Sequence, residues 1–300
     1  MSRLYQAYRH RAGAAKGHAK SRRVTLARRT CNNAHRPMAG GLSNWQRLTM
    51  TIATQTCLVL LALGLLGAAS LALAPLERLA PAGARLSPRT FRLVATLQPA
   101  LLVSLGVALG CGLGGTVGLG APALRAALDG TNVATVLARQ IGPALAVAVL
   151  AAAMIRAYAA LGPAAKTPAP FALPLTTRIL YGGLAEELMM RWGLMSLLAW
   201  AGWQLAGRPE TLPATAAWAA IILAALVFAA GHLPLLARVP SGWRARNVLL
   251  VMVGNTVPGI GFGWLFLARG IEAAMLSHAL AHVLAWALEP RAPAQRPPAP

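Results

Sequence analysis

The stretch ILYGGLAEELMMRWGLMSLLAWAGW, residues 179–203, places three ionisable side chains inside an apolar segment. They are Glu186, Glu187 and Arg191. An unpaired charge is costly in a hydrocarbon environment, so such groups persist mainly where they pair, line a wet cavity or carry chemistry. The stretch therefore predicts a membrane helix that carries a polar site.

The composition of the chain indicates a polytopic membrane protein. Hydrophobic residues make up 57% of the 300 residues and charged residues only 12%, which is unusual for a soluble domain. Apolar runs of about 18 residues or more recur, and each can cross a bilayer as a helix. The runs lack the alternation of membrane β-strands. We expect an all-α transmembrane bundle of about seven spans, near residues 50–74, 93–118, 141–160, 178–205, 214–236, 248–268 and 271–288.

The net charge of +21 is concentrated at the N-terminus. Residues 1–47 hold 11 of the 28 Lys and Arg residues and no Asp or Glu. We expect this basic arm to be cytoplasmic or disordered and to contact anionic lipid of the bilayer. Its aromatic residues are sparse, which disfavours nucleic acid as a partner. A start at Met38 is an alternative, so the sequence leaves open whether residues 1–37 belong to the native protein.

Composition divides the chain into four parts. The basic arm (1–47) is followed by N-terminal transmembrane helices (48–173), a functional core (174–288) and a Pro-rich tail that we expect to be disordered (289–300). With seven spans and a cytoplasmic N-terminus, two arginine-rich loops would lie outside, against the positive-inside tendency. The span count and the orientation therefore stay open.

Smaller signals refine the N-terminal half. Glycines recur every four residues at Gly106, Gly110, Gly114 and Gly118, which predicts a ridge on which another helix packs closely. Residues 121–139 are expected to form a connector with a short surface helix, and Pro143 to lie in the first turn of the third span.

The three cysteines are widely spaced and form no CxxC pair. They predict neither a disulfide framework nor a metal knuckle. Cys57 and Cys111 lie in apolar runs, where we expect small buried hydrophobic residues.

The membrane part contains three histidines, His232, His278 and His282. A spacing of four residues puts the last two on one face of a helix, so both can address a single atom. A lone intramembrane histidine is more often a hydrogen-bonded packing residue. Three histidines and two glutamates in otherwise apolar helices are harder to dismiss, because costly groups are then concentrated in one place.

Helix geometry divides the acidic pair. Glu187 and Arg191 are four residues apart and can form an intrahelical ion pair, whereas Glu186 lies about 100° around the helix. We expect Glu186 to face histidines of neighbouring helices. A carboxylate beside imidazoles in a shielded cavity can activate water.

The order of these motifs resembles the CPBP family, the CAAX prenyl protease and bacteriocin-processing (Abi) intramembrane proteases. The motifs are Glu-Glu-x-x-x-Arg at 186–191, Phe-x-x-x-His at 228–232 and His-x-x-x-polar at 278–282, and the resemblance covers about residues 174–288. It implies an intramembrane endopeptidase that hydrolyses a peptide bond of a membrane-associated protein or peptide. It also implies a multi-pass membrane protein, which we expect in the bacterial cytoplasmic membrane.

The resemblance also implies roles for individual residues. Glu186 matches the family's catalytic glutamate, which would activate water together with His232, and His278 matches a residue that contacts the developing oxyanion. The family usually has Asn where this chain has His282, and a neutral imidazole can still donate one hydrogen bond there. The supporting residues of the motifs are Glu187, Arg191 and Phe228.

The extra histidine leaves the cofactor open. His232, His278 and His282, joined by Glu186, make a credible zinc set, whereas water activation by glutamate and histidine needs no metal. We favour the metal-independent mechanism. Two other functions stay open, a non-catalytic membrane scaffold or maturation factor with the same fold and a proton-coupled transporter. The sequence does not select a substrate or an oligomeric state.

Overall fold

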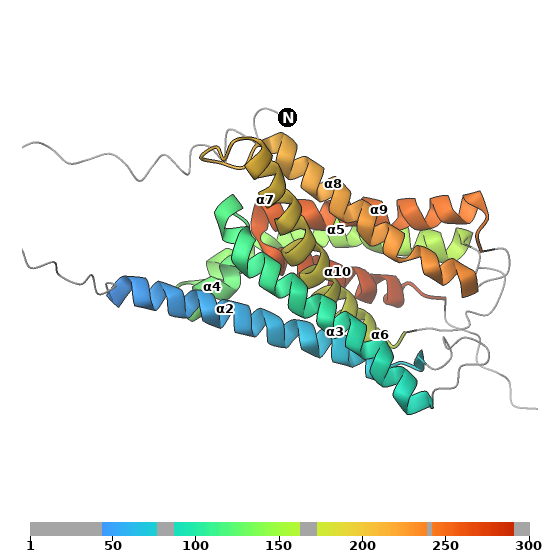
Figure 1. The fold of residues 1–300 in the computed structure, drawn as a ribbon. Coiled ribbons are helices and arrows are strands. Elements are labelled where there is room, and N and C mark those ends of the chain that lie inside the picture. Colours follow the sequence, from blue (N-terminus) through green and yellow to red (C-terminus); the bar gives the residue numbers. More distant parts are fainter. Residues whose placement is uncertain (1–43, 77–86, 163–172, 239–241, 291–300) are drawn as a thin grey trace, which may run out of the picture. The chain divides into compact units, whose positions relative to one another are not determined.

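The computed structural model describes residues 44–76, 87–162, 173–238 and 242–290. These ranges contain helices and turns and no strand (Figure 1), so the expected all-α membrane bundle is confirmed. Most of the basic arm and the Pro-rich tail beyond residue 290 lie outside the described residues. The N-terminal half consists of α2 (Asn44–Ala69), η1 (Ser70–Leu73), α3 (Pro88–Leu113), η3 (Gly114–Val117), α4 (Pro122–Leu128) and α5 (Val133–Leu161).

The core region begins with one long helix of mixed type. It comprises α6 (Leu175–Thr177), the π-helical segments η5 (Arg178–Glu186) and η6 (Leu188–Met195), and α7 (Ser196–Leu205). It is followed by α8 (Ala214–Gly231), the 3₁₀-helix η7 (Leu233–Arg238), α9 (Ala245–Arg269) and α10 (Ile271–Ala287). The expectation of an ordinary α-helix around the acidic pair was therefore wrong. Wide π turns insert extra residues per turn and are frequent at functional sites.

Five of the seven expected spans are helices that are long and apolar enough to cross a membrane. Within the described ranges these are Ile52–Leu73, Arg89–Val117, Val133–Leu161, Ala214–Ala237 and Ala245–Arg269. The last expected span, α10, is a shorter apolar helix, and the span at 178–205 is the mixed π and α helix. The molecule is an integral membrane bundle of helices.

The third span begins earlier than the sequence suggested. Asn132 caps α5, because its side chain accepts a hydrogen bond from the Thr135 N–H at 3.1 Å. Pro143 therefore lies inside the helix and not in its first turn, which corrects the expectation. The short helix expected in the connector is present as α4.

Two of the four glycines of the predicted ridge, Gly106 and Gly110, lie on α3 and pack against the helix that carries the acidic pair, whereas Gly114 begins η3 and Gly118 caps it. A Cβ atom at Gly106 would lie 2.7 Å from the Leu188 carbonyl oxygen, and one at Gly110 would overlap both the indole ring and the carbonyl oxygen of Trp192. Backbone meets backbone here, so only glycine fits. This contact fixes η6 against α3.

Cys57 and Cys111 form a disulfide between α2 and α3, with their Cα atoms 6.2 Å apart. The expectation of two free, buried thiols was wrong. The pairing depends on how two helices face each other across 54 residues of sequence, which no local cysteine spacing reveals.

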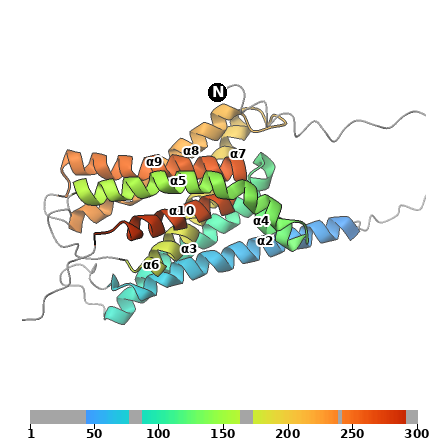
Figure 2. The ribbon, with the colours of Figure 1, turned by 180° about the vertical axis from the view of Figure 1, so that it is seen from behind.

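The helix from Arg178 to Leu205 passes between two groups of helices (Figures 1 and 2). Its π-helical segments contact α2 and α3 on one side and α8 and α10 on the other. Ala185 and Leu188 are fully buried in the main apolar cluster, together with Phe262 of α9. The acidic pair thus lies at the centre of the bundle.

Candidate active site

The predicted site residues come from three helices that meet beside α9. Glu186 ends η5, Glu187 follows it, and Arg191 lies on η6. Phe228 lies in the last turn of α8, and His232 is the residue that caps that helix. His278 and His282 lie one turn apart on α10. The three motifs, far apart in the sequence, are thereby brought together around the acidic pair. They contribute five further residues, Arg191, Phe228, His232, His278 and His282.

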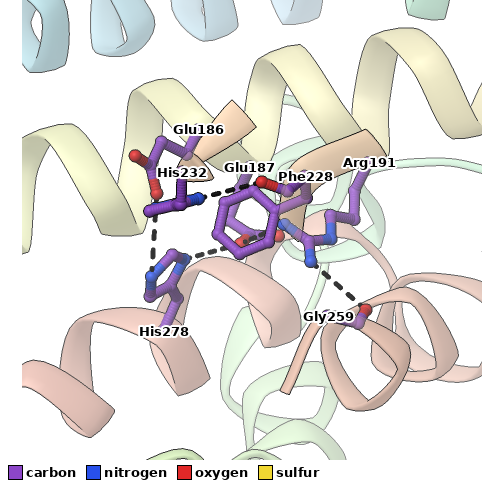
Figure 3. A network of polar contacts seen from close by, with 7 residues as sticks. All are labelled: Glu186, Glu187, Arg191, Phe228, His232, Gly259 and His278. Carbon is purple, nitrogen blue, oxygen red and sulfur yellow. Dashed lines mark hydrogen bonds and ion pairs between the residues drawn. The ribbon is translucent and has the colours of Figure 1, made fainter. Parts of the chain in front are cut away.

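Glu187 holds a buried polar network together (Figure 3). Its Oε1 atom accepts hydrogen bonds from Arg191 Nη1 at 2.9 Å and from His278 Nδ1 at 2.7 Å. The side chains of Glu187 and Arg191 are 0% and 1% exposed. The second guanidinium nitrogen of Arg191 donates to the Gly259 carbonyl oxygen at 3.2 Å. The predicted ion pair between Glu187 and Arg191 is present. Glu187 also holds the His278 ring by a hydrogen bond, which the sequence did not indicate.

Aromatic rings enclose the charged centre of this network. The Arg191 guanidinium lies 4.8 Å from the centroid of Phe228 and 5.3 Å from that of Phe262. Phe262 also stacks on His278, with ring centroids 4.6 Å apart and an interplanar angle of 18°. Cation–π contacts of this kind partly replace water around a buried guanidinium. The rings therefore fix both Arg191 and the plane of His278.

The network determines which nitrogen of His278 is available to a ligand. Nδ1 donates its proton to the Glu187 carboxylate, because an ionised carboxylate can only accept. The other ring nitrogen, Nε2, lies 3.9 Å from Oε2 of Glu186. This distance is too long for a direct hydrogen bond, and one water can bridge the two atoms.

His232 is oriented in a different way. Its Nδ1 atom lies 2.9 Å from the Phe228 carbonyl oxygen, one helical turn earlier. A carbonyl oxygen only accepts, so Nδ1 carries the proton, and in the neutral ring Nε2 is left as an acceptor. The ring also meets Phe228 edge to face at 4.8 Å. His232 can therefore take a hydrogen bond from a water molecule at Nε2.

A cavity of about 150 Å³ joins the polar side chains. Glu186, His232, His278 and His282 all line it, whereas Glu187 and Arg191 lie behind its wall. One water molecule needs roughly 10–15 Å³ of such volume, so the cavity can hold water and part of a ligand. Its remaining described lining is mostly apolar and also includes Arg178, Tyr181 and Asn255.

Gly182 makes room for the two histidines of α10. The His278 and His282 rings stack with centroids 5.0 Å apart. A Cβ atom at Gly182 would lie 2.8 Å from His282 Nε2 and 3.3 Å from His278 Nε2. Next to it, a Cβ atom at Gly183 would lie 2.9 Å from the Cβ atom of Ala279. The Gly-Gly pair in η5 thus lets α10 approach closely, a role that sequence reasoning missed although the pair stands just before the acidic motif.

The predicted zinc ligands are His232, His278, His282 and Glu186. Among the residues that the structure describes, no three His, Cys, Asp or Glu side chains converge on a point where a metal ion could sit. His278 and His282 lie face to face, and zinc ligands need to point at one ion from about 2.0–2.1 Å. The arrangement does not fit the ion, so we derive no step through it. Elemental analysis of the purified protein tests the zinc prediction directly.

Residues 168–284 match the family model described as type II CAAX prenyl endopeptidase Rce1-like. This part of the chain is similar to that family. The resemblance to the CPBP family is thereby confirmed, and the Rce1-like region contains all three motifs that carried it. None of the curated proteins and none of the solved structures matches the chain. At the level of the family, the Rce1-like region indicates a CAAX-type protease within an integral membrane protein.

Proposed function

We propose that the chain is an intramembrane endopeptidase in which Glu186 and His232 activate a water molecule to hydrolyse a peptide bond. The substrate is a membrane-associated protein or peptide, and the bacterial cytoplasmic membrane is the expected location. One observation supports the proposal most. Glu186 faces a cavity shared with three histidines, whereas its neighbour Glu187 is buried and hydrogen-bonded through Oε1 to Arg191 and His278.

The orientation of the side chains suggests the steps. A water molecule in the cavity donates one hydrogen bond to Glu186 and one to Nε2 of His232. Its oxygen attacks the substrate carbonyl carbon while Glu186 takes the proton. When the tetrahedral intermediate collapses, the carbon–nitrogen bond breaks and Glu186 returns the proton to the leaving amine. The products are a new carboxyl group and a new amine.

The histidines of α10 are placed to stabilise the oxyanion. His278 uses Nδ1 for Glu187, so it presents an N–H at Nε2 only as an imidazolium ion. The Nδ1–H of that ring donates at 2.7 Å to the same Glu187 oxygen that accepts from Arg191. His282, stacked on His278, can donate a second hydrogen bond as a neutral ring. The buried network then acts by holding the His278 ring in the required orientation.

The proposal is tested with purified protein in proteoliposomes and a prenylated CAAX peptide reporter. Glu186→Gln should lower kcat by at least about 1,000-fold, a loss comparable to that of other groups that act directly in the chemical step. Its thermal unfolding midpoint should stay close to that of the parent, because Glu186 is not part of the buried network. The matched control is Glu210→Gln, at an exposed glutamate on the loop before α8.

Two outcomes would contradict the proposal. Full activity of Glu186→Gln would exclude the proposed base. A deletion strain whose defect is fully restored by Glu186→Gln would instead favour a non-catalytic scaffold or maturation factor with the same fold. His282, where this chain departs from the family pattern, is the feature that favours this second function.

A further inference from the structure

In the described lining of the cavity, one cation takes no part in the proposed chemistry. Arg178 is the first residue of η5 and lines the same cavity as Glu186. Its Nε atom donates to the Leu173 carbonyl oxygen at 2.9 Å, and Nη1 donates to Oε1 of Glu289 at 2.7 Å. Glu289 lies just beyond the end of α10, which ends beside α6 in both views (Figures 1 and 2). The guanidinium of Arg178 is therefore already paired with the carboxylate of Glu289.

The pair with Glu289 differs from the buried ion pair of the site. The Arg178 side chain is 22% exposed and that of Glu289 is 38% exposed, whereas the pair of Arg191 and Glu187 is excluded from solvent. Partly exposed ion pairs contribute little to stability, so the partner can be exchanged at small cost. The guanidinium is meanwhile held in place by the Leu173 carbonyl oxygen. Arginine presents a planar fork of donors that matches a carboxylate.

We propose that Arg178 is the binding subsite for a carboxylate of the substrate, and that Glu289 occupies this subsite as an internal competitor when no substrate is bound. The inference rests on the proposed function, because it assigns a substrate group to the same cavity. It adds a recognition element that acts on binding and not on the chemical step. The competing residue Glu289 lies outside the Rce1-like region at 168–284.

The spacing along η5 gives the expected position of that carboxylate. Eight residues separate Arg178 from Glu186, so their Cα atoms lie at most about 12 Å apart at about 1.5 Å per residue. An extended peptide covers up to about 3.3–3.6 Å per residue. The carboxylate of the ligand should thus lie on the order of three residues from the bond placed at Glu186. The lining of the cavity also includes apolar side chains such as Leu173 and Ile155, so we expect apolar residues in the bound part of the ligand.

The test measures binding without turnover, in the Glu186→Gln background and in detergent. The probes are three fluorescent apolar decapeptides: one with a free C-terminal carboxylate, one with a C-terminal amide, and one amidated peptide with a glutamate as its last residue. The free acid should bind about 10- to 100-fold more tightly than the plain amide, the range expected for a charge-assisted contact. The third peptide shows whether a side-chain carboxylate can replace the terminal one.

The two partners of the pair should then shift binding in opposite directions. Arg178→Gln should remove the preference for the acid, whereas Glu289→Gln should strengthen acid binding by a few-fold because the competitor is gone. The control is Arg125→Gln, at an exposed arginine that pairs with Asp129 on α4 and lies outside the cavity lining. It should leave both affinities unchanged.

A purely structural tie would behave differently. In that case both variants would weaken or preserve binding together, and the acid and the amide would bind equally to the parent protein. Either result, or no binding of the free acid at all, would overturn the inference. Because binding is measured in an inactive background, a failure of the proposed hydrolysis in the parent protein would be seen separately.

Discussion

Glu186 and Glu187 are neighbours in the chain, yet 16% of the Glu186 side chain is exposed to the cavity and none of the Glu187 side chain is. Each of the two glutamates belongs to a different region of the site. The inner network, made of Glu187, Arg191 and the Gly259 carbonyl, is dry and closely hydrogen-bonded. The cavity face, made of Glu186, His232 and His282, presents polar atoms to open space.

The two regions differ in how their side chains are held and in their access to the cavity. Groups that must keep one position are buried with partners, because a buried charge is held only where it is paired. Groups that exchange protons and ligands need access to water, so they line the cavity. His278 belongs to both regions, since Nδ1 contacts the inner network and Nε2 faces the cavity. In the mechanism that we propose, this ring connects the buried network to the groups that line the cavity.

The largest effect on stability should come from opening the inner network with Arg191→Met. The substitution keeps much of the side-chain volume but leaves the Glu187 carboxylate buried without its cationic partner. Removing one member of a buried pair costs about 3–5 kcal/mol. We expect a loss of this size in denaturant unfolding of the protein in detergent micelles, together with loss of activity.

The chain offers a matched control for this variant. Arg125 and Asp129 are also four residues apart on a helix, but the Arg125 side chain is 65% exposed and the two atoms lie 3.7 Å apart. Arg125→Met should therefore lower the stability by at most about 1 kcal/mol. Equal losses in the two variants would show that burial of the inner network does not matter as we argue.

A smaller effect, on activity, is expected at the cavity face. His282→Ala removes a proposed oxyanion donor and should lower kcat about 100-fold, as loss of one such donor does elsewhere. His282→Asn restores an N–H donor and should keep kcat within about tenfold of the parent. Steady-state cleavage of the CAAX reporter separates the two. If the Asn variant were as impaired as the Ala variant, His282 would act by more than donating a hydrogen bond.

The sequence predicted those parts of the fold and site that depend on local patterns. Apolar runs located the helices, because a membrane span needs a fixed length of apolar residues. The four-residue spacing predicted the pair of Glu187 and Arg191, since both partners lie on one helix face. The motif order identified which histidines meet the acidic pair. The metal set and the catalytic roles stay predictions.

Features that depend on how distant segments face each other could not be predicted. The contact between Glu187 and His278 spans 91 residues, and the disulfide between α2 and α3 spans 54. Helical periodicity separates the faces of Glu186 and Glu187 but does not say which carboxylate meets which ring. The π-helical form of η5 and η6 was also missed, because it follows from packing against neighbouring helices and leaves no periodic signal.

The smallest expected effect concerns the boundary between the two regions at Gly182. In Gly182→Ala, the new methyl group would lie 2.8 Å from His282 Nε2, so the α10 rings must shift. Overpacking of this kind costs about 1–3 kcal/mol, and kcat should fall by less than in His282→Ala, because the displaced rings keep their N–H groups. The control is Gly112→Ala on α3, where no atom lies within 4 Å of the added carbon.

A double variant shows whether the His282 ring is the obstacle. Adding His282→Asn to Gly182→Ala shortens the obstructing side chain, so the double variant should be more stable than the sum of the single effects predicts. If the stability losses of the two single variants simply added, the methyl group would be disturbing the η5 backbone and not the His282 ring. The geometry of the cavity face would then depend mainly on the π-helical backbone of η5.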